Sequence, residues 1–137
     1  MNISHEVYKI SIVLPAKNEA GAIQQTVKAI KQLNRVDEII VVNDGSTDDT
    51  AQIAEQAGAK VISHPYSKGN GAAIKTGVRN AIGDVIVFMD ADGQHDANDI
   101  LKLIEKIEQG YDLVVGARQK GSQASMGRGI ANKLYNN

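Results

Sequence analysis

Short runs of apolar and β-branched residues recur along the chain and alternate with stretches of helical period. Each run has the length of one β-strand, and the stretches between the runs repeat apolar residues every three or four positions, as an amphipathic helix does. The predicted strands are residues 10–14, 38–42, 60–63, 84–89 and 112–115. The apolar residues at helical spacing are Ile23, Val27, Ile30 and Leu33 in the first helix and Ile100, Leu103, Ile104 and Ile107 in the fourth.

Polar residues and glycines mark the ends of the helices between these strands. Ser46 and Asp49 have the spacing of a capping box, which predicts the start of the second helix, and Gly58 predicts its end. The third helix, residues 71–82, has a weaker pattern because Gly77 interrupts it.

The order of these elements predicts a single α/β domain. Residues 39–42 are consecutive apolar residues, which indicates a strand that is buried on both faces of its sheet. Strands that alternate with helices form a mostly parallel sheet with right-handed crossovers. We therefore expect an open, mostly parallel, Rossmann-like sheet flanked by helices on both faces, within residues 1–137.

The composition narrows the classes of function. A net charge of -1 and an aromatic fraction of 4% supply neither the positive field nor the stacking surface that nucleic-acid binding requires. The absence of cysteine excludes thiol chemistry and favours a hard cation over a soft one. The sequence has neither a signal-peptide pattern nor 18 consecutive apolar residues, so we expect a cytoplasmic protein without a transmembrane segment.

Polar residues gather immediately after the predicted strands. In an open α/β sheet, ligands bind in the crevice outside the carboxyl ends of the strands, so these residues are expected to converge on one edge. The segments are residues 15–19, 43–44, 64, 90–94 and 116–118.

Asp90 and Asp92 are the strongest candidates for metal ligands. Alternation along the preceding strand places both carboxylates on the same side, and Ala91 between them is small enough to allow close approach. Mg²⁺ or Mn²⁺ needs only one or two carboxylates when substrate phosphates supply other ligands. An isolated Asp-x-Asp-Gly is more often a plain acidic turn. An EF-hand loop is excluded because its sixth and twelfth positions would be His95 and Leu101.

Three further segments have a functional and a structural interpretation. Asp44 can accept hydrogen bonds from a nucleobase or a ribose hydroxyl, or it can simply be a turn residue before Gly45. Glu19 can bind a ribose, or it can favour the first turn of a helix by its charge. The glycines around Gly71 allow backbone to approach a ligand but match neither a P-loop nor a dinucleotide fingerprint. The three histidines are too scattered for a zinc site.

Four segments in order resemble the family-2 inverting glycosyltransferases with the GT-A fold. They are residues 12–19, 41–48, 68–71 and 88–95. The chain looks most similar to the dolichyl-phosphate mannose synthase and polyprenyl-phosphate glycosyltransferase branch, which also shows a Val-Val-Gly-x-Arg segment like residues 114–118. The resemblance implies transfer of a sugar from a UDP- or GDP-sugar to an acceptor such as a polyprenyl phosphate, at the cytoplasmic face of a membrane.

The resemblance also implies roles for the matching residues. Asp90 and Asp92, with Gln94, would bind Mg²⁺ or Mn²⁺ on the diphosphate and so take part in catalysis, while the arginines would meet phosphate charge. The metal and the arginines stabilise the negative charge that develops on the leaving nucleoside diphosphate. The residues expected at the donor are Pro15, Ala16, Glu19 and Asp44 at the nucleoside, Gly71 and Ala91 at close backbone approaches, and Arg118 and Arg128 at the phosphates.

The resemblance further implies a missing part, because complete catalytic domains of this kind have roughly 200 residues or more. We therefore expect residues 1–137 to be the nucleotide-sugar-binding part, with the acceptor-side half absent. The alternative is a non-catalytic nucleotide-sugar-binding module, or a domain that a partner polypeptide completes. A nucleotidyltransferase is disfavoured because Lys17, Asn18 and Glu19 do not form its glycine-rich basic motif. The sequence leaves the sugar, the acceptor, the catalytic base and the oligomeric state open.

Overall fold

The computed structural model describes residues 8–93 and 97–108. The strands are β1 (Ile10–Ala16), β2 (Glu38–Asp44), β3 (Lys60–His64) and β4 (Val85–Phe88). The helices are α1 (Ile23–Lys31), α2 (Thr50–Gln56), α3 (Asn70–Asn80) and α4 (Ala97–Glu108). Four predicted strands and all four predicted helices are confirmed, with ends shifted by a few residues. The predicted strand at residues 112–115 lies outside the described residues.

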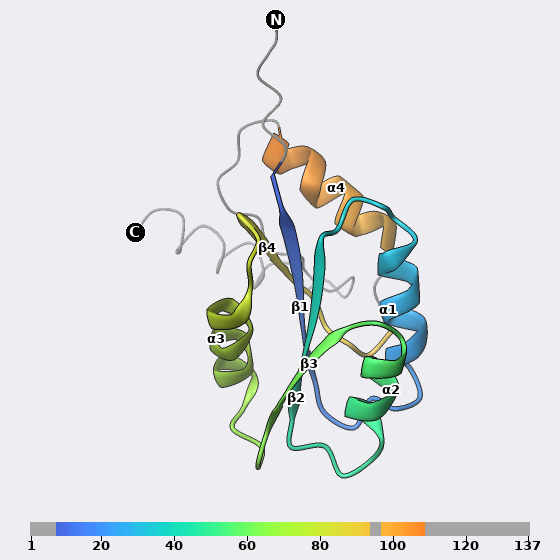
Figure 1. Cartoon of the computed structure of the whole chain (residues 1–137), viewed down its shortest axis with the longest axis vertical. Helices are drawn as coiled ribbons and strands as arrows, with labels where there is room; N and C mark the ends of the chain where they lie inside the picture. The colour runs from blue at the N-terminus through green and yellow to red at the C-terminus, as the bar shows by residue number, and fades with distance from the viewer. Residues whose placement is uncertain (1–7, 94–96, 109–137) are drawn as a thin grey trace, which may run out of the picture.

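The four strands form one parallel sheet in the order β3-β2-β1-β4. Helix α3 packs against β1 and β2 on one face, whereas α1, α2 and α4 lie on the other (Figure 1). A parallel sheet flanked by helices on both faces confirms the predicted fold class. The order also places β1 between β2 and β4, so the carboxyl end of β1 has the ends of β2 and β4 as its neighbours.

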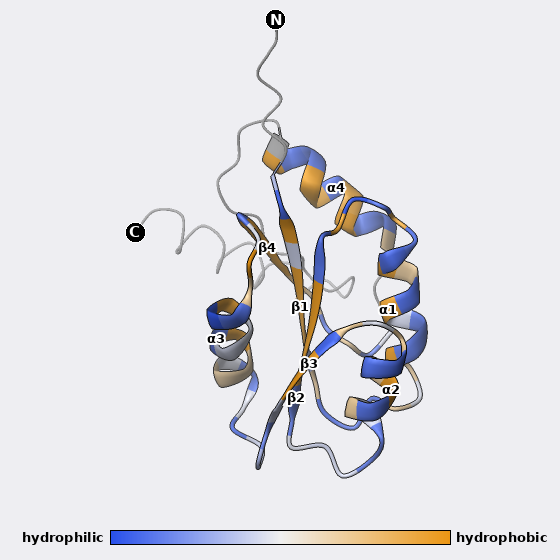
Figure 2. Ribbon diagram, in the orientation of Figure 1, coloured by the Kyte–Doolittle hydropathy of each residue, from blue (hydrophilic) through white to orange (hydrophobic). Residues whose placement is uncertain are grey.

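Alternating residues of the central strands build two hydrophobic cores, one on each face of the sheet. In β1, Ile12 and Leu14 enter the larger core with α1, α2 and α4, while Val13 enters the smaller core under α3. Much of β1 and the middle of β2 carry strong hydrophobic colouring in Figure 2. Burial on both faces explains why residues 39–42 are all apolar, and it holds the two central strands rigidly in place.

Of the two signals predicted for the ends of α2, the stop signal is confirmed and the start signal is not. Gly58 does end the helix: it has a φ of 106°, and its N–H and that of Ala59 donate to the carbonyls of Glu55 and Ala54. This is the bond pattern of a Schellman motif. The predicted capping box is wrong: the N-cap residue is Asp49, its side chain makes no capping hydrogen bond, and the Thr50 N–H donates to the Asp48 carboxylate instead. The Ser46 hydroxyl instead accepts a hydrogen bond from the Asn18 N–H at 2.9 Å, in a different loop.

Helix α3 runs without a break through Gly77, which is buried against the sheet. The glycine that weakens the helical pattern in the sequence therefore marks a close helix-to-strand approach. Among the residues that the structure describes, none of the helices has the length and the apolar composition of a membrane span.

Candidate functional site

Four of the five polar segments predicted to converge do end at the same edge of the sheet. The strands are parallel, so the carboxyl ends of β1, β2 and β3 and the residues after β4 all lie at this edge. Asp44 ends β2, and Asp90 follows β4, on the two sides of β1. Strands in a sheet are about 4.8 Å apart, so two spacings, or about 10 Å, separate strands β2 and β4 themselves. The fifth segment, residues 116–118, lies outside the described residues.

The segment after β4 presents its two carboxylates and buries the residue between them. Asp90 and Asp92 are half-buried. Ala91 retains 1% exposure and belongs to the larger core. The next residue, Gly93, has a φ of 80°, and an added Cβ would be 3.3 Å from the Ala22 Cβ beside α1. The turn therefore lies against the start of α1.

This pair fits the ligand set of a hard cation that also binds phosphate oxygens. Among residues 8–93 and 97–108, no three His, Cys, Asp or Glu side chains gather where they could hold a metal. A cage made entirely of protein ligands is therefore not formed by the described residues. Mg²⁺ and Mn²⁺ sites need only one or two carboxylates when a nucleotide supplies the remaining oxygens. Gln94, the third predicted ligand, lies outside the described residues.

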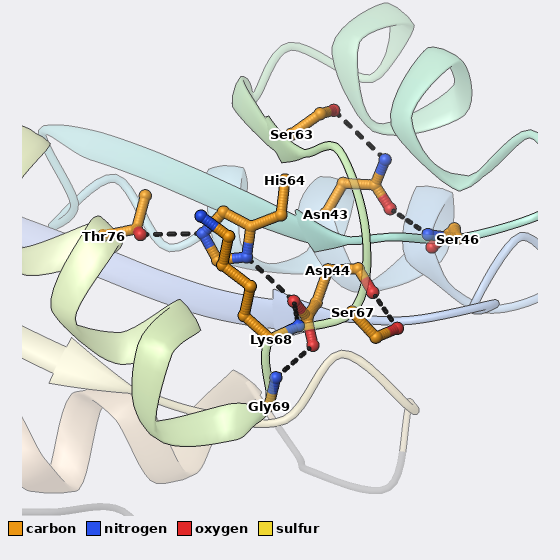
Figure 3. A network of polar contacts seen from close by, with 9 residues as sticks. All are labelled: Asn43, Asp44, Ser46, Ser63, His64, Ser67, Lys68, Gly69 and Thr76. Carbon is orange, nitrogen blue, oxygen red and sulfur yellow. Dashed lines mark hydrogen bonds and ion pairs between the residues drawn. The ribbon is translucent and has the colours of Figure 1, made fainter.

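The Asp44 carboxylate is the centre of a buried polar network at the end of β2 (Figure 3). Its Oδ1 lies 2.8 Å from His64 Nδ1 and accepts the Lys68 N–H at 2.8 Å. Its Oδ2 accepts the Gly69 N–H at 3.0 Å. The Asp44 carbonyl accepts the Ser67 hydroxyl at 2.8 Å. The network ties the end of β2 to the loop that enters α3.

These contacts keep Asp44 ionised although it is only 7% exposed. Burial acts to raise the pKa of its carboxyl group, but the hydrogen bonds from His64, Lys68 and Gly69 act to lower it, and the net pKa lies below the usual value of 3.8. An ionised carboxylate only accepts hydrogen bonds. A ligand at Asp44 must therefore present an N–H or O–H group.

Gly45 allows the loop before α3 to close on the end of β2. Its φ is 72°, and an added Cβ would be 2.5 Å from the Ser67 N atom. Only glycine fits both the left-handed conformation and this backbone contact. Gly69, at the end of the same loop, has a φ of 100°.

A second set of hydrogen bonds fastens the loop after β1 to the loop after β2. Asn18 donates its N–H to Ser46, and its side-chain Oδ1 accepts the Thr47 N–H at 2.8 Å. The Glu19 N–H donates to the Thr50 hydroxyl at 2.8 Å. Asn18 adopts a φ of 55°, which is uncommon for a residue other than glycine. The segment that carries Pro15, Ala16 and Glu19 is therefore held in a defined position beside β2.

Asp48 strengthens the same loop contact. Its carboxylate accepts the Ala20 N–H at 3.2 Å and the Thr50 N–H at 3.0 Å, together with the Thr50 hydroxyl. The hydrogen bond from the Thr50 side chain is the largest influence, and the pKa of Asp48 lies below 3.8. Asp48 thus acts within the loops that surround the edge of the sheet.

The remaining predicted site residues differ in exposure. Pro15 and Glu19 are half-buried, Ala16 is buried with 3% exposure, and Gly71 is exposed in the first turn of α3. Arg118 and Arg128 lie outside the described residues.

Sequence reasoning placed residue 64 and residues 15–19 at this edge, but it did not predict the side-chain contacts of His64, Thr76, Asn18 or Asp48. The signal for His64 is present only in the paired strands, where Asp44 and His64 are register partners at the ends of β2 and β3. The partner of Asn18 is a loop almost thirty positions along the chain, so no local pattern reveals it.

The family match agrees with this architecture. Residues 11–134 match the model of the family described as glycosyl transferase family 2. The chain belongs to glycosyl transferase family 2. Its parallel sheet and flanking helices form the GT-A fold that the resemblance implied.

Two relatives and one solved enzyme are among the proteins similar to this chain. Undecaprenyl-phosphate 4-deoxy-4-formamido-L-arabinose transferase of Proteus mirabilis (strain HI4320) is 35% identical over 99% of this chain and 44% of the relative. The transferase of the same name from Photorhabdus laumondii is 36% identical over 96% of this chain and 43% of the relative. The chain thus spans less than half the length of these relatives.

The solved enzyme is glucosyl-3-phosphoglycerate synthase from Mycobacterium tuberculosis. Its complex with UDP superposes with a TM-score of 0.68 at 35% identity, over 75% of this chain and 41% of the synthase. The same synthase in complex with Mn²⁺, UDP and glucosyl-3-phosphoglycerate gives a TM-score of 0.67 at 35% identity, over 75% of this chain and 40% of the synthase.

Proposed function

We propose that this chain is the nucleotide-sugar-binding part of an inverting glycosyltransferase that transfers a sugar from a UDP- or GDP-sugar to a polyprenyl phosphate. The observation that carries the proposal is the common edge at which the ionised Asp44 and the Asp90–Asp92 turn lie on either side of β1. Membership of glycosyl transferase family 2 supports the interpretation of this edge as a donor-binding site.

The divalent cation is Mg²⁺ or Mn²⁺, held by Asp90 and Asp92 with Gln94 and by the donor diphosphate. Two half-buried carboxylates at this edge, on either side of the buried Ala91, support this assignment because carboxylate oxygens are ligands of hard cations. When bound, the cation neutralises charge on the leaving diphosphate. The mycobacterial synthase binds UDP together with Mn²⁺ or Mg²⁺, which supports the same class of cofactor here.

The nucleoside lies between the loops after β1 and β2. Pro15, Ala16 and Glu19 form one side, and Asp44 accepts a hydrogen bond from the base or its ribose. The cross-loop bonds of Asn18 and Glu19 support this placement because they fix the first loop before any ligand arrives. Preorganised groups bind with a smaller loss of conformational entropy.

The phosphates and the sugar lie beyond the nucleoside. The backbone comes close to the donor at Gly71 and Ala91, and Arg118 and Arg128 supply positive charge at the phosphates. Positive groups placed where charge develops stabilise the transition state more than the ground state.

The acceptor follows from the chemistry that the relatives' names describe, which is transfer to undecaprenyl phosphate. A lipid phosphate is already an anion, so its oxygen can attack the anomeric carbon with little help from a general base. Such an acceptor places the reaction at the cytoplasmic face of a membrane, where this chain makes peripheral contact.

Calorimetric titration with UDP, GDP and their sugars in the presence of Mn²⁺ tests the binding half of the proposal. We expect either UDP or GDP to bind, and the sugar derivative of that same nucleotide to bind as well. If none of these compounds binds, the proposal is contradicted. Turnover is then measured with undecaprenyl phosphate in detergent. Release of the nucleoside diphosphate supports an enzyme, while donor binding without turnover supports the non-catalytic module or a domain that a partner completes.

A further inference from the structure

The His64 ring joins three elements at the site. Its Nδ1 lies 2.8 Å from Asp44 Oδ1 at the end of β2, and its Nε2 lies 2.8 Å from the Thr76 hydroxyl in α3 (Figure 3). The ring itself ends β3 and is 8% exposed. Both ring nitrogens therefore have a partner within the protein, and the ring has one orientation.

The charges of these partners decide which nitrogen carries hydrogen. Asp44 is ionised and only accepts, so Nδ1 must donate to it. The Thr76 hydroxyl can donate to Nε2 of a neutral ring. The Asp44 carboxylate therefore sets which ring nitrogen carries the hydrogen, and the Thr76 hydroxyl on α3 adds a second contact to the ring.

The same contacts determine what remains available on the carboxylate. Oδ1 has two protein partners, His64 and the Lys68 N–H, whereas Oδ2 has the Gly69 N–H. Each carboxylate oxygen has about two acceptor positions. Among the residues that the structure describes, one acceptor position on Oδ2 therefore remains for a further donor, and its direction is set by the three bonds that fix the carboxylate plane.

We propose that His64 is a positioning residue for nucleotide recognition, which holds the Asp44 carboxylate so that Oδ2 accepts a hydrogen bond from the donor nucleoside. This inference rests on the proposed function. It goes beyond that function because it assigns the geometry of the nucleoside contact to a side chain that does not itself touch the ligand.

Two substitutions of His64 separate the bond to Asp44 from the bond to Thr76. The amide nitrogen of His64→Asn takes the place of Nδ1 and can donate to Asp44, whereas the longer His64→Gln places its amide near Nε2 and Thr76. Thr76→Val removes the hydroxyl with little change in shape and leaves the bond to Asp44. Each variant is titrated with UDP and GDP at saturating Mn²⁺, and its folding is checked by circular dichroism and thermal melting.

We expect His64→Gln to weaken nucleotide affinity about tenfold, which corresponds to the loss of one hydrogen bond to a charged group. His64→Asn and Thr76→Val should remain within about threefold of wild type, because both keep a donor at Asp44. A purely structural role would not produce this difference, because it predicts that affinity falls in step with the melting temperature in all three variants.

Either equal losses in His64→Asn and His64→Gln or full affinity in His64→Gln overturns the positioning role while leaving the proposed function intact. Absence of nucleotide binding by the wild-type chain overturns both. A measurement on the wild type needs no substitution: the His64 Nδ1–H proton, observed by NMR, should shift when UDP or GDP is added with Mn²⁺. An unchanged resonance in a chain that binds nucleotide contradicts the proposal, even if His64→Gln does not fold.

Discussion

Gly77 in α3 lies so close to Val13 in β1 that a Cβ added to the glycine would be 2.3 Å from Val13 Cγ1. The helix therefore sits on the sheet at a distance that no side chain larger than hydrogen allows. Because α3 also carries Thr76, the partner of His64, this close approach fixes how the helix meets the site.

Gly77→Ala is expected to destabilise the fold. Alanine favours a helix over glycine by roughly 1 kcal/mol, but overpacking against a rigid strand costs about 1–3 kcal/mol, so we expect a net loss. Urea unfolding measures it. Gly71→Ala is the matched control in the same helix, since nothing lies within 4 Å of its added Cβ. The control should not lose stability, and an equally stable Gly77→Ala would show that the contact is not tight.

Substitutions of Asn18 should separate its hydrogen bonds from its backbone conformation. Asn18→Gly loses the bonds of Oδ1 to Thr47 but tolerates the φ of 55°. Asn18→Ala loses the same bonds and also strains the left-handed backbone by about 1 kcal/mol. We expect both variants to be less stable than wild type by urea unfolding, with Asn18→Ala the less stable of the two. Equal stability of all three proteins would rule out a structural role for the Asn18 side chain.

The Asp44 carboxylate should make stability depend on pH in the acid range. Its pKa in the folded chain lies below the usual 3.8, so its ionised form stabilises the fold above that value. This contribution is lost as the pH falls through the lower pKa of the folded state. The difference in unfolding free energy between wild type and Asp44→Asn should therefore be constant near neutral pH and shrink below about pH 4. A difference that does not change between pH 7 and pH 3 would contradict the assignment.

Much of the fold could be predicted because its signals are local. In α4, Ile100, Ile104 and Ile107 are spaced to one side of a helix, and all three are buried. The position of Asp44 and Asp90 at one edge follows from the rule for parallel sheets, which needs only the strand ends. The four described polar segments were therefore correctly expected at one edge of the sheet.

The side-chain contacts of the site could not be predicted, because they join distant parts of the chain. Ser46 and Asp49 match a capping box by spacing, yet the Ser46 hydroxyl accepts the Asn18 N–H because folding brings that donor next to it. The pairing of His64 with Asp44 likewise requires β3 to lie beside β2. Strand order is set by tertiary packing, so neither contact can be read from local residue patterns.

The metal dependence of nucleotide binding tests the central claim most directly. UDP and GDP are titrated with and without Mn²⁺ into wild type, Asp92→Ala and Asp84→Ala. Asp84 is the control because it lies at the amino end of β4, away from the carboxyl ends of the strands, and its substitution removes the same type of side chain. We predict that Mn²⁺ strengthens binding at least about tenfold in wild type and Asp84→Ala, and has no effect in Asp92→Ala. Metal-independent binding by wild type, or metal dependence retained in Asp92→Ala, would contradict the account.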